Sequence, residues 1–300
     1  MAVKILYLSP GLMADYQCDM LFHGLRTLYG GGVVDCQKIQ PLYQGYPTET
    51  LYGKGFTLYG LLPDIDVDRS DIPERIVSHE FDLIIYGSIQ RYSPYFDLVI
   101  AHYRREEILF IDGEDQTSLL LNLAKLGLYF KRELPESIPN VYPIHFAIPA
   151  SKIGRLCHLP KTRVRAHIDP RDRSTYIYST EQEYYSDYAQ SLFAFTVKKG
   201  GWDCLRHYEI MANGCIPLFL DLDQCPSTTC MQLPKGELLE ALQYQDRDGS
   251  YWDTEEGKNL WLSLYRRIHL KFACHSTTER LADYVLRTQR EAISGLERTA

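Results

Sequence analysis

The residues with the clearest capacity for chemistry lie in one segment, residues 191–221, which reads SLFAFTVKKGGWDCLRHYEIMANGCIPLFLD. Its spacing predicts a strand, a turn with two lysines and two glycines, a helix and a second strand. The glycines let the backbone approach a ligand closely, and the start of the helix offers free N–H groups at the positive end of its dipole. Cations grouped at such a turn form an anion site that suits a pyrophosphate.

The turn itself supplies backbone, cations and one aromatic side chain. Lys198 and Lys199 directly precede Gly200 and Gly201, and Trp202 follows. We expect the two lysines and the glycine N–H groups to contact phosphate oxygens. We expect Trp202 to stack on a sugar or a nucleobase, because it stands beside the glycine turn.

The helix after the turn adds a further cation and a carboxylate. We expect Asp203 to cap this helix and Arg206 to reach the phosphates from its first turn. Glu209 lies on the same helical face, three positions after Arg206, and its carboxylate can accept both hydroxyl protons of a ribose. Alternatively, Arg206 and Glu209 form an ordinary surface pair, because a glycine turn before a helix is common in α/β proteins.

The elements that would position this site alternate along the chain. Short apolar runs at residues 3–8, 33–34, 81–86 and 108–111 are typical of buried strands, and helical spacing separates them. This alternation predicts an α/β fold with a doubly wound parallel sheet. Residues 41–75 are rich in Tyr, Gly, Pro and Asp, which predicts a long irregular insertion.

The second half repeats the alternation. We expect strands at 175–178, 192–197 and 216–220, and helices at 181–190, 203–213, 255–272 and 277–296. Five prolines between residues 135 and 160 predict the crossing between two domains. We therefore expect domains at 1–150 and 151–300, with the last helix returning to brace the first domain. Among the 23 tyrosines we expect most to pack at the edge of the core, and Tyr178 to face a ligand.

One further pattern runs through the central segment, in the order Ser191, Phe193, Gly200, Arg206, Glu209 and Gly214-Cys215-Ile216-Pro217. In this order the residues resemble the C-terminal half of exostosin-like glycosyltransferases. The resemblance implies a GT-B fold, in which two Rossmann-like domains face each other across a cleft. It also implies that Arg206 contacts the diphosphate of a nucleotide-sugar donor and that Glu209 contacts its ribose. Lys198 and Lys199 stand where that family has a proline-containing stretch, and residues 1–150 do not match it, so the sugar and the acceptor do not follow.

Loops after two of the expected N-terminal strands carry candidates for a catalytic base. Asp112 and Glu114 follow the strand at 108–111 closely enough to project into a cleft, and Asp15 follows the first strand. An inverting sugar transfer needs a base to take the proton of the acceptor hydroxyl, whereas a retaining transfer does not. Alternatively, these carboxylates bind turn backbone or cap helices. His23 is expected to pack within its own helix.

No motif points clearly to a metal ion. The DxD of residues 221–223 follows a strand, in a segment that reads as a GT-B domain. The alternating carboxylates of residues 64–68 lack the glycine and the closing glutamate of an EF-hand loop. Cys225 and Cys230, with His207, lack the paired spacing of zinc ligands. We therefore expect neither a metal nor a cofactor other than the donor substrate.

The composition limits the class of protein and the partners that the chain can have. The 300 residues are 45% hydrophobic and 24% charged, which is typical of a globular chain, and the net charge of -7 argues against nucleic acid as a partner. The charged runs 131–133 and 163–165 could approach phosphates at the cleft, but we expect each of them on a solvated face. No apolar run approaches the ~20 residues of a membrane helix, and the first residues lack the long apolar part of a secretory signal. We expect a cytoplasmic protein with free thiols.

These observations together predict a glycosyltransferase that moves a sugar from a nucleotide-diphosphate donor to a carbohydrate or glycan acceptor. The alternative is a non-catalytic nucleotide-sugar binding protein that keeps the donor site. A Rossmann dehydrogenase is disfavoured, because no G-x-G-x-x-G follows the first strand.

Overall fold

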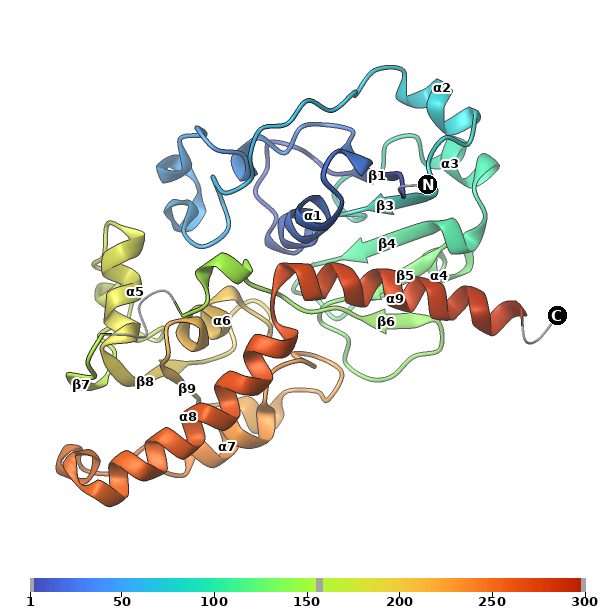
Figure 1. Cartoon of the computed structure of the whole chain (residues 1–300). Helices are drawn as coiled ribbons and strands as arrows, with labels where there is room; N and C mark the ends of the chain where they lie inside the picture. Colours follow the sequence, from blue (N-terminus) through green and yellow to red (C-terminus); the bar gives the residue numbers. More distant parts are fainter. Residues whose placement is uncertain (1–2, 155–158, 298–300) are drawn as a thin grey trace.

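The computed structural model describes residues 3–154 and 159–297 and shows an α/β chain with two parallel sheets (Figure 1). The strands are β1 (Ile5–Leu8), β2 (Val33–Asp35), β3 (Leu83–Tyr86), β4 (Ile108–Asp112), β5 (Leu128–Lys131), β6 (Val141–Pro143), β7 (Arg163–Arg165), β8 (Ser191–Thr196) and β9 (Ile216–Phe219). The helices are α1 (Tyr16–Tyr29), α2 (Ile72–Val77), α3 (Phe96–His102), α4 (Leu123–Leu126), α5 (Glu181–Ala189), α6 (Leu205–Ala212), α7 (Lys235–Leu242), α8 (Glu255–His275) and α9 (Thr278–Glu297). The predicted α/β class is confirmed.

The first sheet has six parallel strands in the order β2-β1-β3-β4-β5-β6. The chain leaves β1 toward one edge and returns to build the other, as in a doubly wound Rossmann-like sheet. Ile5 and Tyr7 belong to one apolar cluster, and Leu6 and Leu8 belong to the other. Both faces of the sheet are therefore buried, which explains why its strands read as continuous apolar runs.

Helices cover both faces of this sheet. The face of Ile5 packs with α1 and α9, and the opposite face packs with α2, α3 and α4. The first of these two clusters continues into the second sheet, since it also contains Phe193 of β8 and Ile216 of β9. The two sheets are thus joined by one continuous apolar core, although the chain divides into two halves in sequence.

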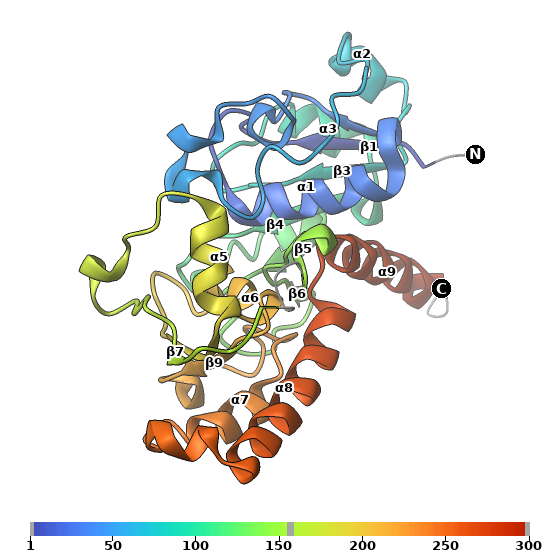
Figure 2. The ribbon, with the colours of Figure 1, turned by 60° about the vertical axis from the view of Figure 1, so that its left-hand side comes forward.

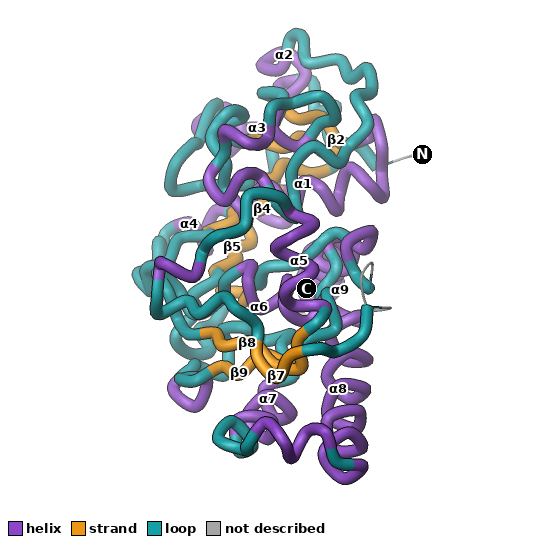
Figure 3. The backbone as a smooth tube through the Cα atoms, turned by 90° about the vertical axis from the view of Figure 1, so that its left-hand side faces the viewer, coloured by secondary structure: helices purple, strands orange, loops and turns teal. Residues whose placement is uncertain are grey.

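The second sheet has three parallel strands in the order β7-β8-β9. Helices α5 and α6 lie on the side that faces the first sheet, and α7 and α8 lie on the opposite side (Figures 1 and 3). The strand expected at 175–178 is not formed: Tyr176 and Ile177 are 44% and 61% exposed and lie in irregular backbone. The edge strand is instead β7. Because it contains two exposed arginines, it does not read as an apolar run. The same charged side chains disfavour pairing of this edge with a further strand.

The irregular insertion after β2 ends at Asp71, four residues before its predicted end at residue 75, because α2 begins at Ile72. It contains three short 3₁₀ helices, at Gln40–Leu42, Thr48–Thr50 and Tyr52–Gly55. The last of these 3₁₀ helices lies next to α5 of the second half (Figure 2). In the segment before α5, the carbonyl oxygen of Tyr178 accepts a hydrogen bond from Lys54 Nζ at 3.1 Å.

The last helix runs back along the first sheet. α8 packs with α6 and α7, and α9 then packs against α1 (Figure 1). The Tyr284 hydroxyl of α9 donates to the carbonyl oxygen of Pro143 at 2.7 Å, and Thr278 Oγ1 is hydrogen-bonded to His23 Nδ1 at 2.9 Å. The chain end therefore ties the second half to the first. Among the described helices, none is both long and apolar enough to cross a lipid bilayer.

The closest approach between α1 and α9 generates a prediction. A Cβ atom added to Gly24 would lie 1.9 Å from the carbonyl oxygen of Thr278, so Gly24→Ala forces the two helices apart. We expect this variant to lower the free energy of unfolding by about 1–3 kcal/mol, measured by urea denaturation. Gly31→Ala is the matched control, because no atom lies within 4 Å of its added Cβ. Equal losses in the two variants would show that this contact is not tight.

Candidate functional site

A cavity of about 530 Å³ is lined by residues of both halves. Seven of the nine residues predicted to hold a donor line it: Tyr178, Lys199, Gly200, Gly201, Asp203, Arg206 and Glu209. The first half contributes Asp115 and Phe146, and the insertion contributes Tyr52, Lys54 and Phe56. The cavity therefore collects most of the predicted donor residues, and it also includes groups that the sequence did not single out.

The other two predicted residues, Lys198 and Trp202, do not line the cavity. The Lys198 ammonium lies over the Trp202 ring, 4.9 Å from its centroid. The backbone N–H of Lys198 donates to the Asp221 carboxylate at 3.1 Å, so the first carboxylate of the DxD holds the turn. These two side chains pair with each other beside the cavity.

Arg206 is the cation with the most unused hydrogen-bonding capacity in the cavity. Its Nη2 donates to the Tyr176 hydroxyl at 2.6 Å, but its Nε and Nη1 are buried and have no hydrogen-bond partner. No carboxylate within the described residues forms an ion pair with it. Burial opposes its charge, yet the neighbouring Cys204 and tyrosines outweigh burial and raise the pKa of Arg206 above its ordinary value. A charged guanidinium with free donors is a binding group for an anion.

Glu209 is buried and already accepts two hydroxyl hydrogen bonds. Thr57 Oγ1 donates to Oε1 at 2.5 Å, and the Tyr184 hydroxyl donates to Oε2 at 2.6 Å. Burial raises the pKa of Glu209, while these two hydrogen bonds and Arg206 act in the opposite direction. The carboxylate thus has the pairing with hydroxyl groups that the sequence analysis expected from a ribose, but here the protein supplies both hydroxyls.

Thr57 reaches Glu209 in a strained conformation. Its φ of 77° is in the left-handed region, which β-branched residues rarely adopt. Its backbone N–H donates to Glu181 Oε1 at 2.6 Å, and its Oγ1 is also within 2.6 Å of the Tyr185 hydroxyl. Such strain persists only where the surroundings fix the residue. No local pattern in the irregular insertion could have identified this contact.

The glycine turn lies in close contact with two carboxylates of the protein itself, those of Asp115 and Glu133. Glu133 accepts hydrogen bonds from the backbone N–H groups of Trp202 and Asp203, at 2.9 and 3.0 Å. A Cβ added to Gly200 would lie 1.9 Å from Asp115 Oδ2, and one added to Gly201 would lie 2.4 Å from Glu133 Oε1. The N–H groups of Trp202 and Asp203, which directly precede α6, are therefore engaged by Glu133 and not free for phosphate. Gly200 and Gly201 have no side chain, and this allows the carboxylates of Asp115 and Glu133 to approach the turn.

Asp203 does not cap α6, contrary to the prediction. Its Oδ2 accepts from the backbone N–H of Phe146 at 2.7 Å, and its Oδ1 accepts from the Tyr208 hydroxyl at 3.0 Å. The N-cap residue is Cys204, which makes no capping hydrogen bond. Asp203 is buried and connects the chain after β6 to α6, so a long-range contact takes the place of a local one.

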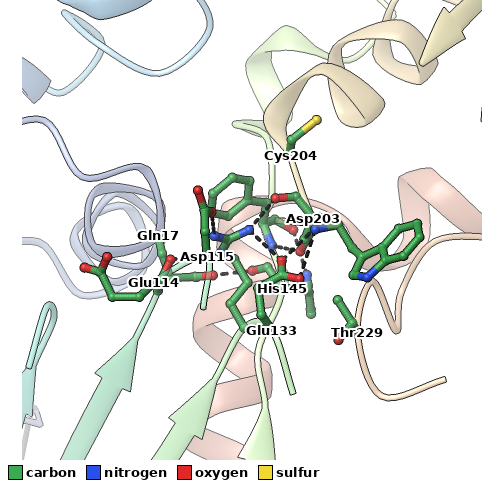
Figure 4. Close-up of polar contacts among 12 residues, drawn as sticks. Gln17, Glu114, Asp115, Glu133, His145, Asp203, Cys204 and Thr229 are labelled. Carbon is green, nitrogen blue, oxygen red and sulfur yellow. Dashed lines mark hydrogen bonds and ion pairs between the residues drawn. The ribbon is translucent and has the colours of Figure 1, made fainter. Parts of the chain in front are cut away.

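The charged run 131–133 is buried between the two halves, although we expected it on a solvated face. Arg132 Nη1 donates to Glu133 Oε1 at 2.8 Å and also to the carbonyl oxygen of Asp203. Its Nη2 donates to Asp115, and its Nε donates to the carbonyl oxygen of Gly113 at 3.0 Å. Figure 4 shows Asp115, Glu133 and Asp203 gathered around these contacts. Burial disfavours the charge of Arg132, but the surrounding carboxylates outweigh it and raise its pKa.

Asp112, the first candidate base, is buried and fully engaged. Its Oδ1 pairs with Lys131 Nζ at 2.9 Å, and its Oδ2 accepts from the Tyr129 hydroxyl at 2.5 Å and from Gln90 Nε2 at 2.7 Å. It does not line the cavity. This environment agrees with the alternative that the carboxylate holds the loop after β4.

Glu114 and Asp15, the other candidate bases, lie on either side of Arg91, also away from the cavity. Glu114 Oε1 accepts from Arg91 Nε at 2.5 Å and points away from Asp203 in Figure 4. Asp15 caps α1 and accepts from Ser88 Oγ at 2.6 Å, with Arg91 Nη1 3.4 Å away. His23 is hydrogen-bonded to Thr278 of α9, whereas we expected it to pack within its own helix, and burial lowers its pKa to about 4.

Asp115 is the carboxylate that the sequence analysis missed. It follows Glu114 directly and lines the cavity, and its side chain is 52% exposed. No local signal separates it from its two acidic neighbours, because only the path of the chain after β4 turns its side chain toward Gly200 and Arg132. Its position makes it the candidate base that faces a bound ligand.

The described residues contain no group of three or more His, Cys, Asp or Glu side chains arranged to hold a metal ion. Fold and site together define an α/β protein with a ligand-sized cavity between two parallel sheets. No protein-family model matches the chain, and no curated protein matches it. The proposals for function therefore depend on the geometry of the cavity and on the resemblance of residues 191–221.

The buried ion-pair network gives a stability prediction. Arg132→Met leaves the Glu133 carboxylate buried without its cation, so we expect a loss of about 3–5 kcal/mol in the free energy of unfolding. Adding Glu133→Gln removes the uncompensated charge and restores part of that loss. Chemical denaturation of both single variants and the double variant measures the coupling. Losses that simply add would show that the two side chains do not interact.

Asp19 gives a pH prediction. Burial and the nearby Asp15 raise the pKa of Asp19 to about 8. The folded protein then holds a proton that the unfolded chain releases near pH ~4, so stability falls as the pH rises from about 4 to about 8. Asp19→Asn keeps an acceptor for Tyr59 but cannot ionise. We expect it to reduce that fall, measured by denaturation at several pH values, by on the order of 2 kcal/mol.

The control for this measurement is Asp246→Asn, on an exposed loop. It should retain the pH dependence of the parent protein. The interpretation fails if Asp19→Asn and Asp246→Asn have the same stability profile between pH ~4 and pH ~8.

Proposed function

We propose that the protein is a glycosyltransferase of the exostosin-like, two-domain GT-B type that uses a nucleotide-diphosphate sugar as donor. The observation that carries the proposal is Arg206: the residue lines the cavity, its Nε and Nη1 donate to no group, and no carboxylate in the described part of the chain pairs with it. A diphosphate would provide the acceptors that Nε and Nη1 lack. Lys199 lines the same cavity and adds a second positive charge, although its ammonium now donates to the carbonyl oxygen of Pro170.

The ribose of the donor would bind at Glu209. Its two oxygens accept hydrogen bonds from Thr57 and Tyr184, so the carboxylate is oriented toward hydroxyl donors. A ribose diol would take the place of at least one of these groups, and Thr57 is the one held by a strained backbone. Movement of the insertion would accompany donor binding in this proposal.

Aromatic side chains beside these groups would hold the base or the sugar. Tyr176 and Tyr178 line the cavity from the second half, and Tyr52 and Phe56 line it from the insertion. Rings on both sides suit a planar or apolar face of a ligand. Tyr178, which the sequence analysis selected, is therefore retained as a candidate contact.

Transfer would use electrostatics at the leaving group and a carboxylate at the acceptor. Arg206 would stabilise the charge that develops on the departing diphosphate. Asp115 replaces Asp112, Glu114 and Asp15 as the proposed base, because it alone of these four lines the cavity. Its partial exposure leaves room for an acceptor hydroxyl to approach.

The alternative, a nucleotide-sugar binding protein without transferase activity, is favoured by one observation. Asp115 also pairs with Arg132, so the candidate base is held by an ion pair. Hydrolysis or transfer in a panel of nucleotide sugars distinguishes the two functions. A donor that binds but is never consumed, with any glycan acceptor, would leave only the binding function.

The phosphate assignment predicts a specific loss of affinity. Arg206→Gln removes the charged donors, so affinity for nucleoside diphosphates, measured by calorimetry with UDP, GDP, ADP and CDP, should fall about 10- to 100-fold. Arg266→Gln is the matched control, because Arg266 is exposed on α8 and does not line the cavity. Unchanged affinity in Arg206→Gln would overturn the assignment.

The base assignment predicts a different pattern. Asp115→Asn should retain nucleoside diphosphate affinity within about threefold and reduce the turnover of an inverting transfer by roughly 100-fold or more. Donor affinity and turnover are measured on the same preparation. A parent-like turnover would exclude Asp115 as the base and would agree with a retaining mechanism.

A further inference from the structure

Two cysteines that form no metal site lie together at the junction of the two halves. Cys225 Sγ donates to the carbonyl oxygens of Pro226 at 3.6 Å and of Thr229 at 3.7 Å, and Thr229 directly precedes Cys230. The turn between them brings them together, since the Thr229 N–H donates to the carbonyl oxygen of Pro226 at 3.2 Å. No third ligand joins them in the described part of the chain. A pair of adjacent thiols without a metal has the composition of a redox-active dithiol.

The two thiols differ in burial and in pKa, and a stepwise oxidation requires such a difference. Cys225 is half-buried, and its partner thiol and Lys235 lower its pKa against the effect of burial. Lys235 Nζ donates to the carbonyl oxygens of Pro226 and Thr229, both at 2.6 Å, so the ammonium is fixed beside the turn. Cys225 is therefore the thiol with the greater thiolate character, which is the form that reacts.

Cys230 has the opposite environment. It is completely buried, and burial together with Cys225 raises its pKa well above the ordinary value of a thiol. Its φ of 50° is in the left-handed region, which is uncommon for a residue with a side chain. An external oxidant cannot reach it first, but it can attack the neighbouring Cys225 sulfur once that sulfur has been modified.

We propose that Cys225 and Cys230 form a reversible internal disulfide by exchange with a small-molecule disulfide such as oxidised glutathione. The Cys225 thiolate attacks one sulfur of that disulfide and displaces one thiolate. Cys230 then loses its proton to solvent and attacks the Cys225 sulfur, displacing the second thiolate. Two protein thiols are oxidised by two electrons, and one small disulfide is reduced to two thiols.

The position of the pair connects it to the core of the junction. Thr228 Oγ1 and Thr229 Oγ1 donate to the carbonyl oxygen of Leu134, at 2.5 and 2.8 Å. Leu134 follows Glu133, whose carboxylate holds the N–H groups of Trp202 and Asp203. Closing the disulfide brings the two sulfurs to bonding distance and so pulls on the turn that carries both threonines.

The test is a redox titration of the intact chain. The protein is equilibrated in buffers with different ratios of oxidised to reduced glutathione, quenched in acid and alkylated, and its cysteine peptides are identified by mass spectrometry. We expect one internal disulfide, between Cys225 and Cys230, that is half formed at a measurable ratio and reopens in reduced glutathione. The proposal is overturned if both thiols stay alkylated in oxidised glutathione alone, or if the bond persists in reduced glutathione.

Variants separate the two steps. Cys230→Ser, or Cys230→Ala if the serine is not accepted in the core, should trap Cys225 as a mixed disulfide with glutathione. Cys225→Ser should leave Cys230 unmodified in the folded protein. Cys274→Ser, which removes an exposed cysteine, should keep the internal disulfide. Modification of Cys230 in Cys225→Ser at the rate of Cys225 in the parent would contradict the assigned order.

Lys235→Gln tests why Cys225 reacts first. Loss of the ammonium should slow the modification of Cys225 several-fold, while the far-UV circular dichroism spectrum stays that of the parent. An unchanged rate would remove Lys235 from the proposal. None of these measurements depends on nucleotide binding, so their result is independent of the proposed glycosyltransferase function.

Discussion

The arrangement of the two halves depends on one buried cation, Arg132. Its guanidinium binds Glu133, Asp115 and two backbone carbonyl groups, one on each side of the junction. Such a group is stable inside a protein only when every charge is compensated, which makes the network sensitive to the loss of any member. Because Glu133 in turn holds the N–H groups before α6, the same network fixes one wall of the cavity.

The cavity is built by segments that are far apart in the chain. Helix α6 supplies Arg206 and Glu209, the loop after β4 supplies Asp115, and the insertion supplies Tyr52 and Phe56. The carboxyl ends of parallel strands gather such loops at one edge of a sheet, which is why ligand sites form there. The proposed donor site and the Cys225–Cys230 pair both lie beside this junction, and Glu133 with Leu134 connects them.

The candidate site was only partly accessible to sequence reasoning. Arg206 and Glu209 could be selected because three-residue spacing places them on one face of a helix. Thr57 and Asp115 could not, since their roles arise from contacts with residues more than 80 positions away. The same limit explains the expectations for Asp203, which accepts from the Phe146 N–H and does not cap α6, and for Arg132, whose charged neighbours made burial look unfavourable.

By itself the sequence determined what depends on local order. Apolar runs and helical spacing fixed the α/β class, most strands, the long C-terminal helices and the irregular insertion, because each of these follows from the period of the hydrophobic pattern. The tertiary structure alone decided the six-stranded order, the edge strand β7 and the selection of Asp115 over Asp112 at the cavity. These features depend on which distant groups satisfy buried charges and hydrogen bonds, and a linear pattern does not contain that information.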